Sequence, residues 1–227
     1  MSGVSDPDGA ASTRVIAVRH GETAWNAQTR IQGHTDIALN ARGRWQAERL
    51  AVALAHETVH AIYSSDLQRA HDTALPFARS AGLTVQIAPG LRERGFGAFE
   101  GLSFAEIESR WPEDARRWRR REPQFAPAGG EALADFHARC VGACAALAER
   151  HRGQTILLLS HGGVLDCLYR AATRAAADAP RSWPIGNATV NRLLHSETGF
   201  TLVGWADTGH LDEEPDDGRR LGEAGIA

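Results

Sequence analysis

The chain has 227 residues and a formal net charge of −3, from 25 Lys and Arg against 28 Asp and Glu. This length suits one large domain with a sizeable core. The sequence pI of about 6.4 argues against a nucleic-acid partner or an anionic membrane surface, because the chain has no overall basic field to attract them. No apolar run approaches the ~18 residues of a membrane span, so no membrane partner is expected.

The cysteine pattern favours a reducing compartment. Cys140, Cys144 and Cys167 form no CxxC pair, and the first two lie four residues apart in a helical stretch, where small buried side chains are expected. The first twelve residues lack the basic and apolar regions of a signal peptide. We therefore expect a cytoplasmic protein with mobile polar ends at residues 1–12 and 212–227.

Between these ends, apolar runs alternate with helical patterns. Strands are predicted at residues 13–18, 59–64, 84–88, 154–160, 190–195 and 201–206, and helices at 40–56, 66–81, 131–151 and 163–175. Such alternation is typical of right-handed βαβ units. The expected fold class is α/β, with one domain over residues 13–211, a mainly parallel central sheet and helices on both faces.

Local signals indicate where three of these helices begin and which side they bury. Asn40 is a good N-cap for the first helix, and Ser65-x-x-Gln68 matches a capping box for the second. The third helix has one apolar stripe, made of Leu133, Phe136, Cys140, Cys144 and Leu147. We expect this stripe to pack on the sheet.

Residues 102–130 interrupt the alternation. Ser103-x-x-Glu106 opens a short helix, and the segment that follows mixes Trp, Arg and Pro without a strand pattern. Insertions of this kind usually lie over the carboxyl edge of the sheet, so we expect a short helical cap there. Five arginines fill six positions at 116–121. A solvated helical face is favoured for this run, whereas an inward orientation would indicate a polyanionic substrate.

Charged residues follow three of the predicted strands. Arg19 and His20 end the first, Arg69 lies in the first turn of the helix after the second, and His161 follows the run ILLLS. Taken singly, each is explained by a solvated turn or a satisfied side chain. In a parallel sheet, however, these strand ends meet at one edge, where helix N-termini add positive potential. The combination predicts an anion site, and phosphate suits the forked donors of arginine.

One of these segments, RHGETAWN (19–26), resembles the signature of the histidine phosphatase superfamily, the phosphoglycerate-mutase-like group. The resemblance covers about residues 14–211 and continues in RIQGHTDIALN (30–40), SSDLQRAHDTA (64–74), LRERGFGAFEG (91–101), PAGGEALADF (127–136) and SHGGVL (160–165). Several matching motifs are far more specific than one. The similarity is greatest to the small-molecule phosphatases of the family.

The resemblance implies that His20 is the nucleophile and becomes a phosphohistidine, with its tautomer fixed by a backbone acceptor. It implies that Arg19, Arg69 and His161 bind the phosphoryl oxygens, and that Glu93 acts as proton donor and then as base. Further substrate contacts are expected from Asn26, Gln32, Gly33 and Gly162. Two guanidinium groups and an imidazolium can offset a phosphate dianion, so we expect no metal and no cofactor.

A site of this kind can hydrolyse esters or transfer phosphate between hydroxyls of one substrate. Glu93 and His161 are closer in sequence than in the family's mutases, and Phe96 stands where mutases usually have a tyrosine. We therefore expect a phosphomonoesterase with a small phosphorylated metabolite as its substrate. A cofactor-primed phosphoglycerate mutase is the alternative, supported by the arginine run. A catalytically inactive binding module is disfavoured because all five catalytic residues are present, and a homodimer is left open.

Overall fold

The computed structural model describes residues 12–212, and the expected ends at 1–12 and 212–227 lie outside it except for Ser12 and Asp212. Six strands form one sheet in the order β3-β2-β4-β1-β5-β6. They are β1 (Thr13–Arg19), β2 (Ala61–Ser64), β3 (Val85–Ile87), β4 (Thr155–Ser160), β5 (Val190–Ser196) and β6 (Gly199–Asp207). All six correspond to strands expected from the sequence.

The sheet is parallel over its first four strands. β1 pairs with β4, β4 with β2, and β2 with β3, all in parallel. β5 is antiparallel to β1 and β6 is antiparallel to β5. The mainly parallel α/β fold class is therefore confirmed, with an antiparallel hairpin added at one edge.

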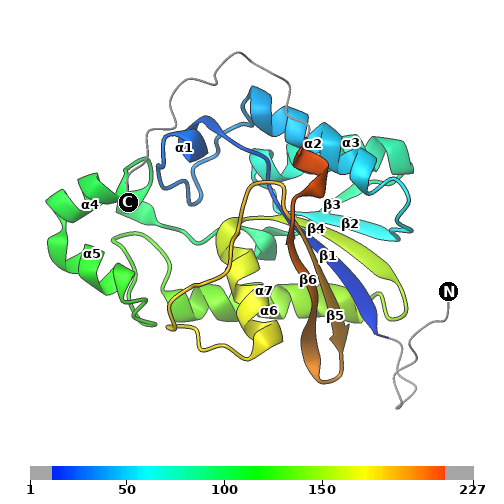
Figure 1. The fold of residues 1–227 in the computed structure, drawn as a ribbon. Coiled ribbons are helices and arrows are strands. Elements are labelled where there is room, and N and C mark those ends of the chain that lie inside the picture. The colour runs from blue at the N-terminus through cyan, green and yellow to red at the C-terminus, as the bar shows by residue number, and fades with distance from the viewer. Residues whose placement is uncertain (1–11, 213–227) are drawn as a thin grey trace.

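Helices cover both faces of the sheet (Figure 1). The covering helices are α2 (Ala41–Ala53) and α3 (Gln68–Ala81) on one face, and α6 (Leu133–Glu149) and α7 (Gly162–Thr173) on the other. Val15 and Ala17 of β1 pack in the core cluster of α6 and α7, whereas Ile16 and Val18 pack in the cluster of α2 and α3. This alternation explains why β1 is apolar throughout. No helix within residues 12–212 is long and apolar enough to cross a membrane.

Of the three signals expected for the helices that cover the sheet, two are confirmed and one is wrong. The Asn40 side chain accepts from the N–H of Gly43 and caps α2, and the apolar stripe of α6 is buried. The capping box at Ser65 does not form, because α3 begins only at Gln68 with Leu67 as N-cap. Ser65 instead accepts from the N–H of Leu67, while the N–H of Gln68 donates to Asp36 from another loop. A tertiary partner therefore replaces the local one.

The inserted segment forms two short helices beyond the carboxyl ends of the parallel strands (Figure 1). α4 (Phe104–Arg110) begins with the expected capping box between Ser103 and Glu106, and α5 (Pro112–Arg119) follows at once. A small core cluster of the cap consists of Phe99, Ile107, Ala115 and Phe125. Shorter elements connect the parts: α1 (Ala24–Ala27), η1 (Pro89–Leu91), η2 (Gly97–Phe99) and η3 (Gly209–Leu211).

The loop after β1 and the first turn of α2 approach each other very closely. A Cβ atom added at Gly43 would lie 2.1 Å from the carbonyl oxygen of Glu22, and one added at Gly21 would lie 2.5 Å from the carbonyl oxygen of Gly43. Both neighbours are backbone atoms, so neither can move away as a flexible side chain would. This contact fixes the loop that follows His20.

We expect Gly43→Ala to destabilise the fold by about 1–3 kcal/mol, because the added methyl forces the two backbones apart. Gly142→Ala is the matched control: Gly142 is an exposed position of α6 with nothing within 4 Å of an added Cβ. There, alanine should stabilise the helix by about 0.5–1 kcal/mol. Urea unfolding of both variants measures the difference, and equal stability of the two would contradict the close contact.

Candidate active site

His20 follows β1 and is held in one orientation by the backbone. Its N–H donates to the carbonyl of Ser160 at the end of β4 (2.9 Å), and its ring Nδ1 lies 2.7 Å from the carbonyl oxygen of Gly21. A carbonyl only accepts, so this contact assigns the proton to Nδ1 and leaves the Nε2 lone pair available. The expected backbone control of the tautomer is therefore present.

Burial keeps the His20 imidazole neutral. The side chain is 3% exposed, and desolvation, reinforced by the charges of Arg69 and Arg19, holds its pKa well below the ordinary value of about 6.5. A neutral imidazole with a free nitrogen is the nucleophilic form. At neutral pH the ring is thus ready to attack an electrophile.

His161 lies beside His20, at the N-terminal end of α7. The two ring centroids are 5.2 Å apart, and within residues 12–212 neither ring nitrogen of the fully buried His161 has a hydrogen-bond partner. Desolvation, followed by the charge of Arg69, also holds the pKa of His161 well below its ordinary value. Its two nitrogens are therefore available to a ligand.

Two arginines complete the cluster, each fixed by backbone carbonyls. Arg69 is fully buried and donates to the carbonyls of Thr35 (2.9 Å) and Gly33 (2.7 Å), and Arg19 donates to that of Ile185 (2.7 Å). In both arginines Nε is buried without a partner among the described residues. Burial lowers the pKa of Arg69 to about 10, so it stays cationic at neutral pH. The cluster presents fixed, unused N–H donors, as an oxyanion requires.

Glu93 is held at the margin of this cluster by the backbone. Its carboxylate accepts from the N–H of Arg94 (2.8 Å) and from the N–H of Gly163 (3.0 Å), in the first turn of α7. A Cβ atom at Gly163 would lie 2.2 Å from a carboxylate oxygen of Glu93, so glycine is needed there. Desolvation lowers the pKa values of Arg19 and Arg69, and the charge of Glu93 partly offsets this effect. The structure thus brings together all five predicted catalytic residues.

The other four predicted contacts lie around the same centre, largely in supporting positions. Asn26 accepts from the N–H of Thr23, and Gln32 accepts from the Thr23 hydroxyl. Gly33 offers its carbonyl to Arg69, and Gly162 begins α7 next to Arg19. Direct contact of these residues with substrate stays a prediction.

Sequence reasoning missed three residues that shape the site: Thr73 in α3, and Ile185 and Asn187 in a loop without a periodic pattern. The Asn187 side chain donates to the carbonyl of His20 (2.9 Å), and the Thr73 hydroxyl accepts from the N–H of Gly21 (2.9 Å). Ile185 contributes only a backbone carbonyl, which leaves no trace in the sequence. Asn187 follows a short irregular stretch, and no spacing rule linked it to a histidine 167 positions away.

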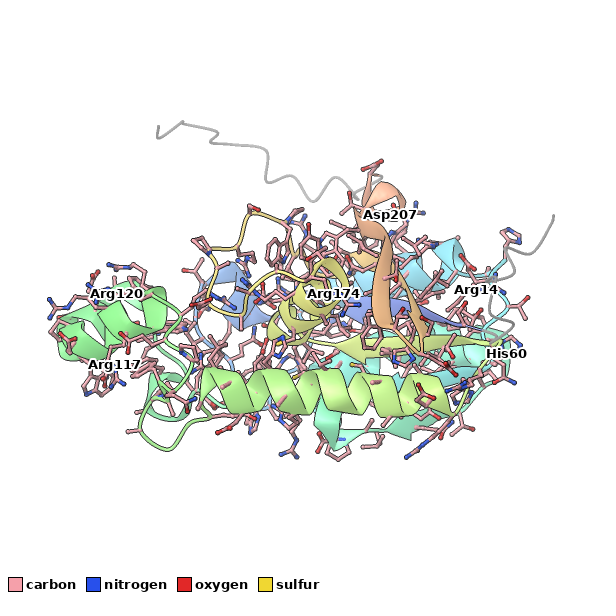
Figure 2. The ribbon with its side chains drawn as sticks, turned by 90° about the horizontal axis from the view of Figure 1, so that it is seen from below. Arg14, His60, Arg117, Arg120, Arg174 and Asp207 are labelled. Carbon is pink, nitrogen blue, oxygen red and sulfur yellow. The ribbon has the colours of Figure 1, made fainter. Side chains whose placement is uncertain are left out.

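A cavity of about 480 Å³ opens beside Glu93 and Gly163, between the cap and α7. Its charged lining residues are Glu93, Arg94, Arg119, Arg121, Asp166 and Arg181. The prediction that the arginine run faces solvent is confirmed for the ion-paired Arg116 and Arg117 and for the exposed Arg120. Figure 2 shows Arg117 and Arg120 at the end of the molecule that is remote from His60. It is wrong for Arg121, which pairs with the buried Asp166 (2.7 Å).

No cluster of three or more His, Cys, Asp or Glu side chains suited to a metal ion occurs in the part of the chain that the structure describes. The donors of the cluster are cationic or neutral nitrogens, which suit an anion. A group with a tetrahedral oxyanion therefore fits the chemistry of the site better than a cation does.

Comparison with known proteins identifies a family and several similar proteins. The sequence model of the histidine phosphatase superfamily (branch 1) matches residues 15–208. The chain is 39% identical over 204 residues to phosphoglycerate mutase-like protein 4 of Arabidopsis thaliana, covering 88% of this chain and 87% of that protein. It is 35% identical over 202 residues to the metal-independent phosphoserine phosphatase of Arabidopsis thaliana, covering 88% and 83%. The structure of a mycobacterial glucosyl-3-phosphoglycerate phosphatase in complex with VO3 matches with a TM-score of 0.77 at 32% identity, over 86% of this chain and 99% of that one.

The buried histidines should make the stability of the fold depend on pH. Above about pH 6.5, folded and unfolded chains both hold these histidines neutral. Below it, the unfolded chain binds protons that the folded chain excludes, so stability falls by about 1.4 kcal/mol per pH unit for each such histidine. Urea unfolding between pH 7.5 and 5.5 should show a shallower decline for His161→Gln than for the unmodified chain. Identical slopes would contradict a neutral, buried His161.

Proposed function

The chain belongs to branch 1 of the histidine phosphatase superfamily, and we propose that it hydrolyses small phosphorylated metabolites through a phosphohistidine on His20. The observation that carries this proposal is the neutral His20 imidazole, with a free Nε2, beside unused donors of Arg19, Arg69 and His161. A nucleophile and an oxyanion site are thus adjacent. Relatives that are named as phosphatases support hydrolysis of the phosphate ester as the reaction.

In the first step, Arg19, Arg69 and His161 bind the phosphoryl oxygens, and Nε2 of His20 attacks phosphorus. The N–P bond forms as the P–O bond to the leaving group breaks, and protonated Glu93 gives its proton to the leaving oxygen. The protein does little covalent work beyond this, so most of the rate comes from position and charge. The carbonyls that fix both arginines supply that positioning before substrate arrives.

In the second step, a water molecule enters where the alcohol left and attacks the phosphohistidine. Glu93, now a carboxylate, takes a proton from the water as the N–P bond breaks. Inorganic phosphate forms and His20 returns to its neutral state. One residue therefore serves as acid and then as base, which requires it to lie beside the leaving oxygen.

We extend the proposal to a cytoplasmic location and to turnover without a metal ion. Three buried, unpaired cysteines are consistent with a reducing compartment, and the positive cluster can offset the phosphoryl charge by itself. One relative carries the name metal-independent phosphoserine phosphatase. Activity that persists in a chelator would support the second point.

His20→Ala should lower phosphatase activity by at least about 10⁴-fold while leaving the fold intact, because no other group can replace the nucleophile. His56→Ala, at an exposed position, is the matched control and should retain activity. Hydrolysis of p-nitrophenyl phosphate measures both. A brief reaction of the unmodified enzyme should also yield an acid-labile, base-stable phosphoenzyme in the peptide that contains His20, and phosphate on a serine or aspartate would overturn the proposal.

A phosphoglycerate mutase is the second candidate, because relatives carry that name and Arg119 and Arg121 of the cap line the cavity. The two functions differ in their products. Given 3-phosphoglycerate and a bisphosphate primer, a phosphatase releases inorganic phosphate faster than it forms 2-phosphoglycerate. Rapid isomerisation with negligible phosphate release would establish the mutase instead.

Glu93→Gln should affect esters according to their leaving groups. An alkyl phosphate leaves as a strongly basic alkoxide and needs the proton, so its hydrolysis should fall by about 10²–10⁴-fold. p-Nitrophenolate leaves largely unaided, and its release should show a burst because the second step still needs the base. Rapid-mixing measurements compare the two esters. Equal losses without a burst would mean that Glu93 only helps to bind the substrate.

A further inference from the structure

The 480 Å³ cavity lies where the leaving group of a substrate must extend. Glu93 and Gly163 line its inner end, and Glu93 is the group that protonates the leaving oxygen. Phe104 and Trp118 of the cap form an aromatic wall, with ring centroids 5.7 Å apart. The side chains of this cavity therefore select the alcohol or acid from which phosphate is removed.

Part of the charge in the cavity is already used by the protein. Asp166 accepts from Arg121 (2.7 Å) and from the fully buried Arg170 (2.9 Å). Arg94 is 4% exposed and donates to the carbonyls of Glu131 and Phe125. These side chains bind other parts of the protein, so they are not available to bind a ligand.

Two other guanidinium groups of the cavity are not committed in this way. Arg119 lies over the Phe104 ring, 4.6 Å from its centroid, and pairs with Glu108 (2.8 Å). Both side chains of this ion pair are about half exposed, and such pairs contribute little to stability. Arg181 is exposed and has no hydrogen bond or ion pair with any described residue. Its charge helps to lower the pKa of Arg19, after desolvation, so it lies near the phosphoryl site. The cavity therefore has an excess of available positive charge.

The loop that carries Arg181 is anchored to the rest of the protein just after this residue. Trp183 stacks on Tyr169 of α7, with ring centroids 4.0 Å apart. Two residues further on, the carbonyl of Ile185 accepts from Arg19. Arg181 thus belongs to a segment tied to the catalytic arginine, and its head group is presented from a fixed backbone.

We infer that Arg181, together with Arg119, binds a second anionic group on the leaving group, so that the preferred substrates are phosphomonoesters of small anionic alcohols. The inference rests on the proposed phosphatase function and narrows its substrate class. A carboxylate or a second phosphate fits the forked donors of arginine equally well. Esters of neutral alcohols lack this contact and should be poorer substrates.

Matched esters test the inference. 3-Phosphoglycerate carries a carboxylate where glycerol 3-phosphate has a neutral hydroxymethyl group, and fructose 1,6-bisphosphate differs from fructose 6-phosphate by a second phosphate. The unmodified enzyme should favour the anionic member of at least one kind of pair by about 10- to 100-fold in kcat/KM, as expected for one or two charge-assisted hydrogen bonds. The carboxylate pair and the phosphate pair distinguish the two sources of the anion.

Arg181→Gln should bring that preference to within about threefold, mainly by raising KM for the anionic ester, while p-nitrophenyl phosphate and the neutral esters keep their rates. Arg120→Gln, an exposed cap arginine outside the cavity, is the matched control and should keep the preference. Thermal unfolding verifies that both variants fold.

Three outcomes overturn the inference. The unmodified enzyme could show no preference for an anionic ester, or Arg181→Gln could keep the preference. Arg181→Gln could also slow p-nitrophenyl phosphate as much as the anionic esters, which would mean that it acts through Arg19 and not on the leaving group. Absence of turnover for every ester, p-nitrophenyl phosphate included, would instead refute the phosphatase function and the inference with it.

Discussion

The site depends on burying like charges together. Arg19, Arg69, His20 and His161 meet at one edge of the sheet, and desolvation together with their mutual repulsion forces both histidines to be neutral. The arginines remain charged because desolvation, partly offset by the charge of Glu93, lowers their pKa values only moderately, to about 10 for Arg69. Carbonyls of Gly33, Thr35 and Ile185 bind part of each guanidinium group. The guanidinium N–H groups without a partner are therefore fixed in direction, and little reorganisation is needed when an oxyanion binds. The neutral imidazole of His20 and the oriented guanidinium donors beside it therefore have a common physical origin.

The sequence predicts this centre well because the determinants lie at ends of regular elements. Arg19, His20 and His161 lie at the ends of β1 and β4, and Arg69 lies in the first turn of the helix that follows β2. Because these strands are parallel, the topology places all four residues at one edge of the sheet. Local signals succeed where the partner is also local, as at Asn40 and Ser103. At Ser65 the same kind of signal fails, because Asp36 from another loop takes the N–H that the capping box would have used.

The leaving-group side is much harder to predict. The run at 116–121 has a helical pattern, but helical periodicity does not say which face meets a cavity, and the change of direction at Arg121 (φ 54°) turns that residue toward Asp166. Arg181 and Asn187 lie in irregular backbone whose position depends on aromatic packing with α7. Neither residue belongs to a motif quoted from the sequence. The cluster of arginines and histidines is thus predictable from strand ends, whereas the lining of the cavity depends on loops placed by tertiary contacts.

Glu93 lies at the boundary between these two parts, and its surroundings explain how one carboxyl can serve both steps. The N–H groups of Arg94 and Gly163 donate to its carboxylate and fix it beside the cluster of arginines and histidines. The proposed mechanism needs one group that gives a proton to the leaving oxygen and then takes a proton from a water that enters at the same place. Because these backbone contacts keep the carboxyl in position, a single side chain can meet both requirements.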